Sequence, residues 1–92
     1  MPNKNTNQWS ILFKALGNPY RLDIIKLLNK LGKTAVSDIS KEVGISIKNT
    51  SRNLGILQNL DILKSQGKTD HVYYEINPDL EKDLKTILKL FL

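Results

Sequence analysis

One stretch in the middle of the chain, residues 36–60, restricts the possible folds more than any other. Apolar side chains at Val36, and at three and seven residues beyond it, give a short helix a single apolar stripe. Gly44 follows where that helix must end, because a residue without a Cβ adopts positive φ at little cost. Ser46, a favoured N-cap residue, then precedes a second helical pattern. The stretch therefore predicts two short helices joined by a tight turn.

The second helix of this pair is expected to bury one face and expose the other. Thr50, Leu54 and Leu57 recur at i, i+4 and i+7 and mark the buried face. No acidic residue occurs from position 46 to position 60, and Asn and Arg side chains can pair with adenine and guanine in the major groove. Because any solvated helix can carry such residues, this helix alone leaves DNA contact and plain solvation equally open. The side chains that would contact DNA are Lys48, Asn49 and Arg52 at base edges and Ser46 and Ser51 at phosphates.

The composition excludes several classes of protein. The 92 residues form one small domain, 1–92, whose marginal core would gain from a second subunit. Fourteen Lys and Arg against nine Asp and Glu give a net charge of +5, which favours acidic partners, nucleic acid before membrane. The absence of cysteine excludes disulfides and thiolate chemistry, and a single histidine argues against a Ser-His-Asp site. Without a long apolar run or a signal-peptide pattern, we expect a cytoplasmic protein with no membrane partner, no cofactor and no enzymatic activity.

The chain before this stretch predicts two further helices. We expect residues 1–6 to be disordered and residues 9–16 to form an amphipathic helix. A second helix starts at the capping residue Asn18, which is followed by a proline at the first helical position, where proline is favoured. A very short strand is expected over residues 33–35.

Residues 62–76 predict an antiparallel hairpin. Two β-prone runs flank a four-residue turn, 67–70, that begins with glycine. A basic hairpin directly after a helix pair is what a winged helix uses to contact phosphates beside the major groove. The candidates here are Lys64, Gln66 and Lys68, although Lys68 is equally well explained as an ordinary charged hairpin tip.

Asn77 and Pro78 repeat the capping pattern and predict a last helix over residues 78–92. Its apolar stripe is long for so small a domain, so we predict that it pairs with the first helix across a two-fold dimer interface. The alternative is that the last helix folds back on the core of its own chain. The interface candidates are Trp9, Leu12, Phe13, Leu16, Leu80, Leu84, Ile87, Leu88 and Phe91.

Four segments of the chain resemble the ArsR family of winged-helix repressors. Residues 14–28 are similar to the family pattern ALGDPTRLRILRLL, residues 45–54 to VSxSxVSxHL, residues 57–63 to LxxAGLV, and residues 67–76 to the wing pattern GRxVYYxL. Asn53 stands where the family usually has histidine. The resemblance implies a mainly α fold with a small β-hairpin, in the order ααααββα. It also implies a dimer, built on the first and last helices, that represses transcription from a palindromic operator.

In this scheme, residues 36–60 are the helix-turn-helix, residues 62–76 the wing and residues 78–92 the dimerisation helix. The family's thiolate metal sensor is absent, because Ala35 and Ser37 stand at the two cysteine positions. The last helix has carboxylates but no histidine, and His71, in the wing, is the only histidine of the chain. The resemblance therefore supports DNA binding without metal sensing.

The sequence thus predicts a sequence-specific, DNA-binding transcriptional regulator that acts as a homodimer. Two alternatives stay open, because fold does not decide function. One is a winged-helix module that docks a protein partner, and the other is a protein that coats double-stranded DNA without reading its sequence.

Overall fold

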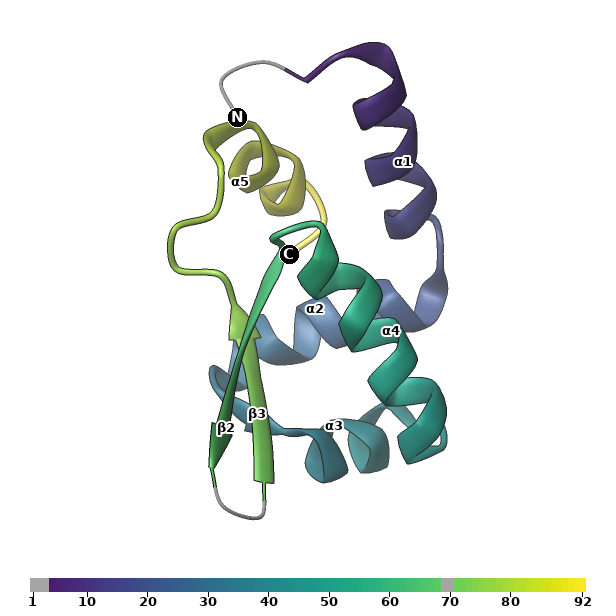
Figure 1. Ribbon diagram of the computed structural model, residues 1–92, viewed down its shortest axis with the longest axis vertical. Coiled ribbons are helices and arrows are strands. Elements are labelled where there is room, and N and C mark those ends of the chain that lie inside the picture. The colour runs from purple at the N-terminus through teal and green to yellow at the C-terminus, as the bar shows by residue number, and fades with distance from the viewer. Residues whose placement is uncertain (1–3, 69–70) are drawn as a thin grey trace.

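The computed structural model describes residues 4–68 and 71–92, and Figure 1 shows their arrangement. The elements are α1 (Thr6–Leu16), α2 (Pro19–Leu31), β1 (Thr34–Ala35), α3 (Val36–Val43), α4 (Ile47–Asn59), β2 (Leu63–Lys68), β3 (His71–Ile76) and α5 (Lys82–Lys89). This order confirms the predicted winged helix-turn-helix and its mainly helical class. It also contains the short strand that was expected before α3.

The amino end of the described chain is more ordered than the sequence predicted. Asn5 caps α1 with a reciprocal pair of hydrogen bonds: the Gln8 N–H donates to Asn5 Oδ1, and the Asn5 N–H donates to Gln8 Oε1, both at 2.9 Å. Lys4 forms an ion pair with Glu81 and lies over the Trp9 ring, 5.5 Å from its centroid. The expected disorder over residues 1–6 is therefore wrong for residues 4–6, while residues 1–3 lie outside the described part.

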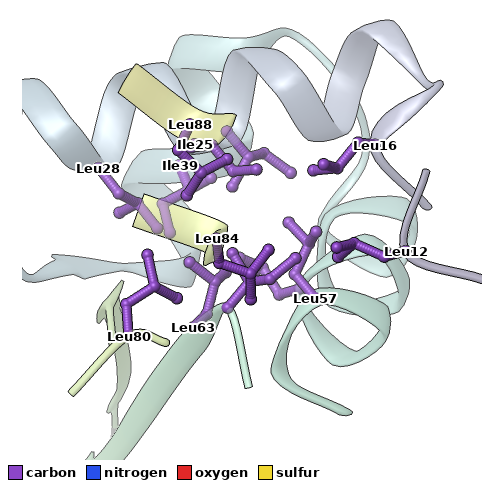
Figure 2. Packing of buried hydrophobic residues seen from close by; sticks show 13 residues of the cluster. Leu12, Leu16, Ile25, Leu28, Ile39, Leu57, Leu63, Leu80, Leu84 and Leu88 are labelled. Atoms are coloured by element: carbon purple, nitrogen blue, oxygen red, sulfur yellow. The ribbon is translucent and has the colours of Figure 1, made fainter. Parts of the chain in front are cut away.

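The hydrophobic core draws side chains from all five helices and from β2, and Figure 2 shows them converging between the helices. Its buried members are Leu12, Leu16, Ile24, Ile25, Leu28, Ile39, Leu54, Leu57, Ile62, Leu63, Leu80, Leu84 and Leu88. Removing this much apolar surface from water is the main force that holds so small a domain together. The last helix therefore helps to close the core of its own chain.

This core corrects part of the predicted dimer interface. Leu12, Leu16, Leu80, Leu84 and Leu88 are buried within the single chain, so a second subunit cannot reach them. The physical reason is that helical spacing identifies the apolar stripe of a helix but not which chain covers it. The alternative, that the last helix folds back on the core of its own chain, agrees with the burial of Leu84 and Leu88 on α5.

The sheet has three antiparallel strands in the order β1-β3-β2. β1 pairs Thr34 with Tyr74, and β2 pairs Leu63 with Ile76 at the end of the hairpin nearest the core. At its free end Lys68 pairs with His71. The first strand of the hairpin thus extends further than predicted, because Gly67 and Lys68, assigned to the turn from sequence, continue β2.

The last helix begins four residues later than predicted, at Lys82 instead of Pro78. Asn77 does not cap a helix: its Oδ1 accepts from the Asp79 N–H at 2.9 Å, and its carbonyl accepts from the Leu80 N–H at 3.1 Å. These two bonds close a tight turn, which an Asn-Pro pair favours as readily as a helix start. The turn places Leu80 in the core before α5 begins.

Candidate nucleic-acid interface

The turn between α3 and α4 is held by a small set of hydrogen bonds around Gly44. Gly44 lies in the left-handed region, with φ 79° and ψ 31°, and its N–H donates to the Ser40 carbonyl at 2.9 Å. The buried Ser40 hydroxyl donates to the Ile45 carbonyl at 2.6 Å, and the Ile45 N–H donates back to the Ser40 carbonyl at 3.3 Å. These bonds hold α4 in a defined orientation relative to α3.

The amino end of α4 is capped by Ser46, as the sequence predicted. Ser46 Oγ accepts from the Asn49 N–H at 3.0 Å, and the Ser46 carbonyl accepts from the Thr50 hydroxyl at 2.8 Å. Thr50, Leu54 and Leu57 are fully buried, which confirms the predicted inner face of the helix. As a capping acceptor, the Ser46 hydroxyl keeps its proton available for a phosphate oxygen.

The exposed face at the amino end of α4 carries polar and basic side chains only, apart from one isoleucine at position 47. Lys48, Asn49, Ser51 and Arg52 are all exposed, and the first turn holds no acidic residue. Unsatisfied N–H groups give this end of the helix a partial positive charge, which adds to that of the two cationic side chains. The structure therefore brings together, within two turns, the predicted contacts of α4 with bases and phosphates.

A chain of hydrogen bonds, which the sequence did not predict, links α4 to α1 through a side chain of α2. Arg21 Nε donates to the Ala15 carbonyl at 2.6 Å, and Arg21 Nη1 donates to Asn53 Oδ1 at 2.9 Å. Asn53 Nδ2 in turn donates to the Asn49 carbonyl at 3.0 Å. Arg21 and Asn53 are 32 positions apart, so their contact leaves no local pattern in the sequence. The one available signal was that Asn53 stands where similar proteins usually have histidine.

The wing side chains proposed from sequence do not all lie in one place. Gln66 is exposed and its Oε1 accepts from Lys33 Nζ at 2.6 Å, while the same Nζ lies 3.6 Å from Glu75 Oε2. Lys64 lies near the base of the hairpin, where its Nζ is 3.7 Å from Asp79 Oδ2. The predicted contact of Lys68 lies outside the described part of the structure, because only its backbone is placed. Lys33, a second basic group beside the wing, was missed from sequence.

Lys64 lies apart from the other residues that were predicted to contact DNA. It lies four residues before Lys68 in β2, and a strand advances about 3.3 Å per residue, so its Cα is roughly 13 Å from the free end of the hairpin. In Figure 1 the amino end of α4, α3 and the free end of the hairpin share the lower end of the molecule, whereas α1 and α5 occupy the upper end. Lys64 thus does not join the α4 residues.

Exposed apolar side chains also occur on α1 and at the carboxyl end of the chain. Phe13 of α1 is 53% exposed and stacks on Trp9, with ring centroids 5.5 Å apart. Ile11 and, after α5, Leu90 and Leu92 are exposed as well. Exposed apolar groups such as Phe13 are candidates for contact with another molecule.

Other classes of site receive little support from the described residues. Two of the carboxylates near the start of α5 are engaged in ion pairs, Asp79 with Lys64 and Glu81 with Lys4. Within residues 4–68 and 71–92, no three His, Asp or Glu side chains are grouped so as to hold a metal ion. None of the helices in this part is long and apolar enough to cross a membrane.

Comparison with known proteins gives a consistent result. Residues 18–65 match the family model described as bacterial regulatory protein, arsR family. The chain is 32% identical to the transcriptional repressor SdpR of Bacillus subtilis over 72 residues, which cover 78% of this chain and 79% of SdpR. It is also 32% identical to the arsenical resistance operon repressor of Escherichia coli over 69 residues, which cover 75% of this chain and 59% of that repressor.

Among solved structures, the fold is similar to a homodimeric winged helix-turn-helix DNA-binding domain from Mycobacterium bovis. The TM-score is 0.76 at 26% identity, over 98% of this chain and 85% of that one. HlyU from Vibrio cholerae has a TM-score of 0.79 at 23% identity, over 96% of this chain and 91% of HlyU.

Proposed function

Because the chain belongs to the ArsR family of bacterial regulatory proteins, we propose that it represses transcription as a homodimer bound to a palindromic DNA operator. It is a winged helix-turn-helix, DNA-binding transcriptional regulator and not an enzyme. The observation that carries the proposal is the exposed, acid-free amino end of α4 on a helix whose other face is fully buried. Since it acts on DNA, we place it in the cytoplasm.

In this proposal α4 lies in the major groove and the wing lies beside it. Lys48, Asn49 and Arg52 contact base edges, where Arg can pair with guanine and Asn with adenine. Ser46 and Ser51 hold phosphates and set the register of the helix in the groove. Gln66 and Lys68 contact flanking backbone, whereas Lys64 is left out because it pairs with Asp79 at the base of the wing.

Dimerisation would use apolar side chains of α1 and of the carboxyl end of the chain. These are the exposed Ile11, Phe13, Leu90 and Leu92, together with the half-buried Trp9, Ile87 and Phe91. The related Mycobacterium bovis domain is homodimeric, which supports this assignment. Two-fold symmetry would place two α4 helices on successive major-groove faces and so require an inverted-repeat operator.

No metal or other cofactor is part of the proposal. Ala35 and Ser37 stand where a thiolate sensor would have cysteines, so metal-dependent release from DNA is not expected. Repression itself is inferred from SdpR and from the Escherichia coli relative, both of which are named repressors.

Binding to random duplex DNA, measured by fluorescence anisotropy at several salt concentrations and followed by enrichment of bound sequences, tests the proposal. We expect steep salt dependence, because each phosphate neutralised adds roughly 0.9 to the slope of log K against log salt. We also expect an enriched inverted repeat. Steep dependence without enrichment would indicate a DNA-coating protein, and no binding at low salt would overturn the DNA assignment in favour of a protein-docking module.

A matched pair of substitutions tests the site itself. Arg52→Ala should weaken binding to the enriched operator by about 1–3 kcal/mol, because a bidentate contact with guanine is lost. Lys64→Ala removes the same charge from the base of the wing and should leave specific binding nearly unchanged. Equal effects of the two substitutions would refute the assignment of α4 as the reading helix.

A second pair tests the dimer. By light scattering at micromolar concentration, the wild-type chain should have twice the 10.5 kDa mass of one chain. Phe13→Glu should give monomers, because it places a charge in an apolar interface. Leu31→Glu alters a residue on α2 that is 52% exposed, nearly the same as Phe13, and should leave the dimer intact. A monomeric wild-type protein would refute the interface.

A further inference from the structure

One exposed side chain in the helix-turn-helix has no role in the folding of the chain. Ile47 is the first residue of α4 and is 58% exposed, and within residues 36–60 no other large apolar side chain is as open to solvent. The core is complete without it, because Ile47 belongs neither to the buried cluster nor to the residues packed against it. A β-branched residue also has no local advantage at this position, since other residues form helices more readily.

The position of Ile47 puts this apolar group where α4 would meet DNA. It is adjacent to Lys48, and it lines a depression of about 280 Å³ between the amino end of α4 and the wing. Val72 of β3, which is 44% exposed, lines the same depression, as do the polar residues Ser37 and Ser51. In Figure 1 this end of α4 and the free end of the hairpin both lie at the lower end of the molecule, with α3 drawn between them. Two exposed apolar side chains, those of Ile47 and Val72, therefore flank a hollow whose other lining residues are Ala35, Val36, His71 and the two serines.

A protein partner does not explain so small a patch. Protein interfaces bury on the order of 800 Å² on each side and have an apolar centre, whereas Ile47 and Val72 line a hollow of only about 280 Å³ that also contains two serines and a histidine. Duplex DNA does offer one apolar group of matching size at the edge of its major groove, the 5-methyl group of thymine. The polar neighbours of Ile47 cannot recognise that methyl group.

Resting on the proposed function, we propose that Ile47 reads a thymine in each operator half-site by packing against its 5-methyl group. The contact removes the methyl group and the exposed part of Ile47 from water together. Burying one methyl group is worth about a 4-fold change in affinity, or roughly 15-fold when both half-sites of a symmetric operator contribute. This contact would let the regulator distinguish thymine from uracil, which differ only in the methyl group and so present the same hydrogen-bonding groups to its polar side chains.

The experiment is a cycle between substitutions in the protein and in the DNA. Each thymine of the enriched operator is replaced in turn by deoxyuridine, which lacks only the 5-methyl group, and affinities are measured by anisotropy. For the wild-type protein, this replacement at one symmetric pair of thymines should lower the affinity for the operator about 15-fold. With Ile47→Ala, the thymine operator should bind more weakly, and the same replacement should then cost nothing further.

Two controls accompany the cycle. Leu31→Ala shortens an aliphatic side chain that is 52% exposed on α2, away from α4, and should retain the full deoxyuridine effect. Ile47→Val leaves a shorter apolar side chain at this position and should retain part of the deoxyuridine effect. Circular dichroism should show that all three variants are folded, because neither residue is buried.

The outcomes separate this inference from the proposed function. If no thymine methyl group matters to the wild-type protein, or if the deoxyuridine effect persists in Ile47→Ala, the role of Ile47 is refuted while specific DNA binding stands. If the wild-type protein enriches no sequence at all, the proposed function fails and the role of Ile47 fails with it.

Discussion

Replacing Arg21 by alanine should destabilise the domain more than any other substitution of a charged residue whose interactions are described above. Arg21 is partly buried on α2 and joins two helices through one side chain. Its Nε donates to the Ala15 carbonyl at 2.6 Å, near the carboxyl end of α1, and its Nη1 donates to Asn53 of α4 at 2.9 Å. Carbonyls at this end of a helix have no partner within the helix, so the cation both satisfies one of them and neutralises the helix dipole.

The magnitude follows from these two bonds. A hydrogen bond from a charged donor contributes about 1.5–3 kcal/mol, and water will replace part of each bond because Arg21 is only partly buried. We therefore expect Arg21→Ala to lower the free energy of unfolding by about 2–3 kcal/mol. Domains have roughly 0.05–0.15 kcal/mol of stability per residue, so this is a large fraction of the total for 92 residues. Arg21→Lys keeps the charge but cannot reach both acceptors, and should lose about half as much.

Urea unfolding followed by circular dichroism, at one fixed protein concentration, measures the change. Lys26→Ala is the matched control, because it removes an exposed cation from the same helix, and it should alter stability by less than about 0.5 kcal/mol. A double-mutant cycle of Arg21→Ala with Asn53→Ala should give a coupling of about 1 kcal/mol, since the two residues bond directly. If Arg21→Ala and Lys26→Ala have the same effect, or if the cycle shows no coupling, this reasoning is wrong.

Substitutions at three further positions test the helix-turn-helix and the core by urea unfolding. Gly44→Ala should cost about 1–2 kcal/mol from backbone strain alone, because φ is 79° and no atom lies within 4 Å of the added Cβ; no loss would contradict the left-handed turn. Ser46→Ala should lower the free energy of unfolding by about 1 kcal/mol, because the α4 cap is lost. Ser46→Asp should keep most of the stabilisation that the cap provides. Leu84→Ala should lower the free energy of unfolding by about 2–5 kcal/mol, as expected for a core residue. If Leu84→Ala instead converted dimers to monomers without lowering the stability of the monomer, Leu84 would belong to the interface as first predicted.

The local features of the fold were predictable because short-range chemistry decides them. The positive φ of Gly44, the cap at Ser46 and the buried stripe of Thr50, Leu54 and Leu57 all follow from residues within one or two turns of each other. The prediction failed where one local pattern fits two conformations. Asn77 and Pro78 suit a helix start and a tight turn equally, and only the burial of Leu80 selects the turn.

The residues of the candidate DNA-binding site also divide into those that local sequence predicts and those that it does not. The exposed residues of α4 could be identified from sequence because they occupy the face opposite a buried stripe. Lys64 could not be judged from sequence, because its ion pair with Asp79 joins positions that the hairpin and the following turn bring together. Lys33 was missed for the same reason: β3 pairs with both β1 and β2, and the sheet so brings Lys33 beside Gln66.

By itself, the sequence determined the order of the helices and strands, where α3 turns into α4, and which face of α4 is polar and free of acidic residues. Spacing, caps and glycine act over a few residues, so a linear pattern is enough to predict them. Only the tertiary structure decided that Leu84 and Leu88 belong to the chain's own core, that Arg21 holds α4 through Asn53, and that Ile47 remains exposed beside the wing. These outcomes depend on which distant surfaces exclude water from one another, and no short window of sequence contains that information.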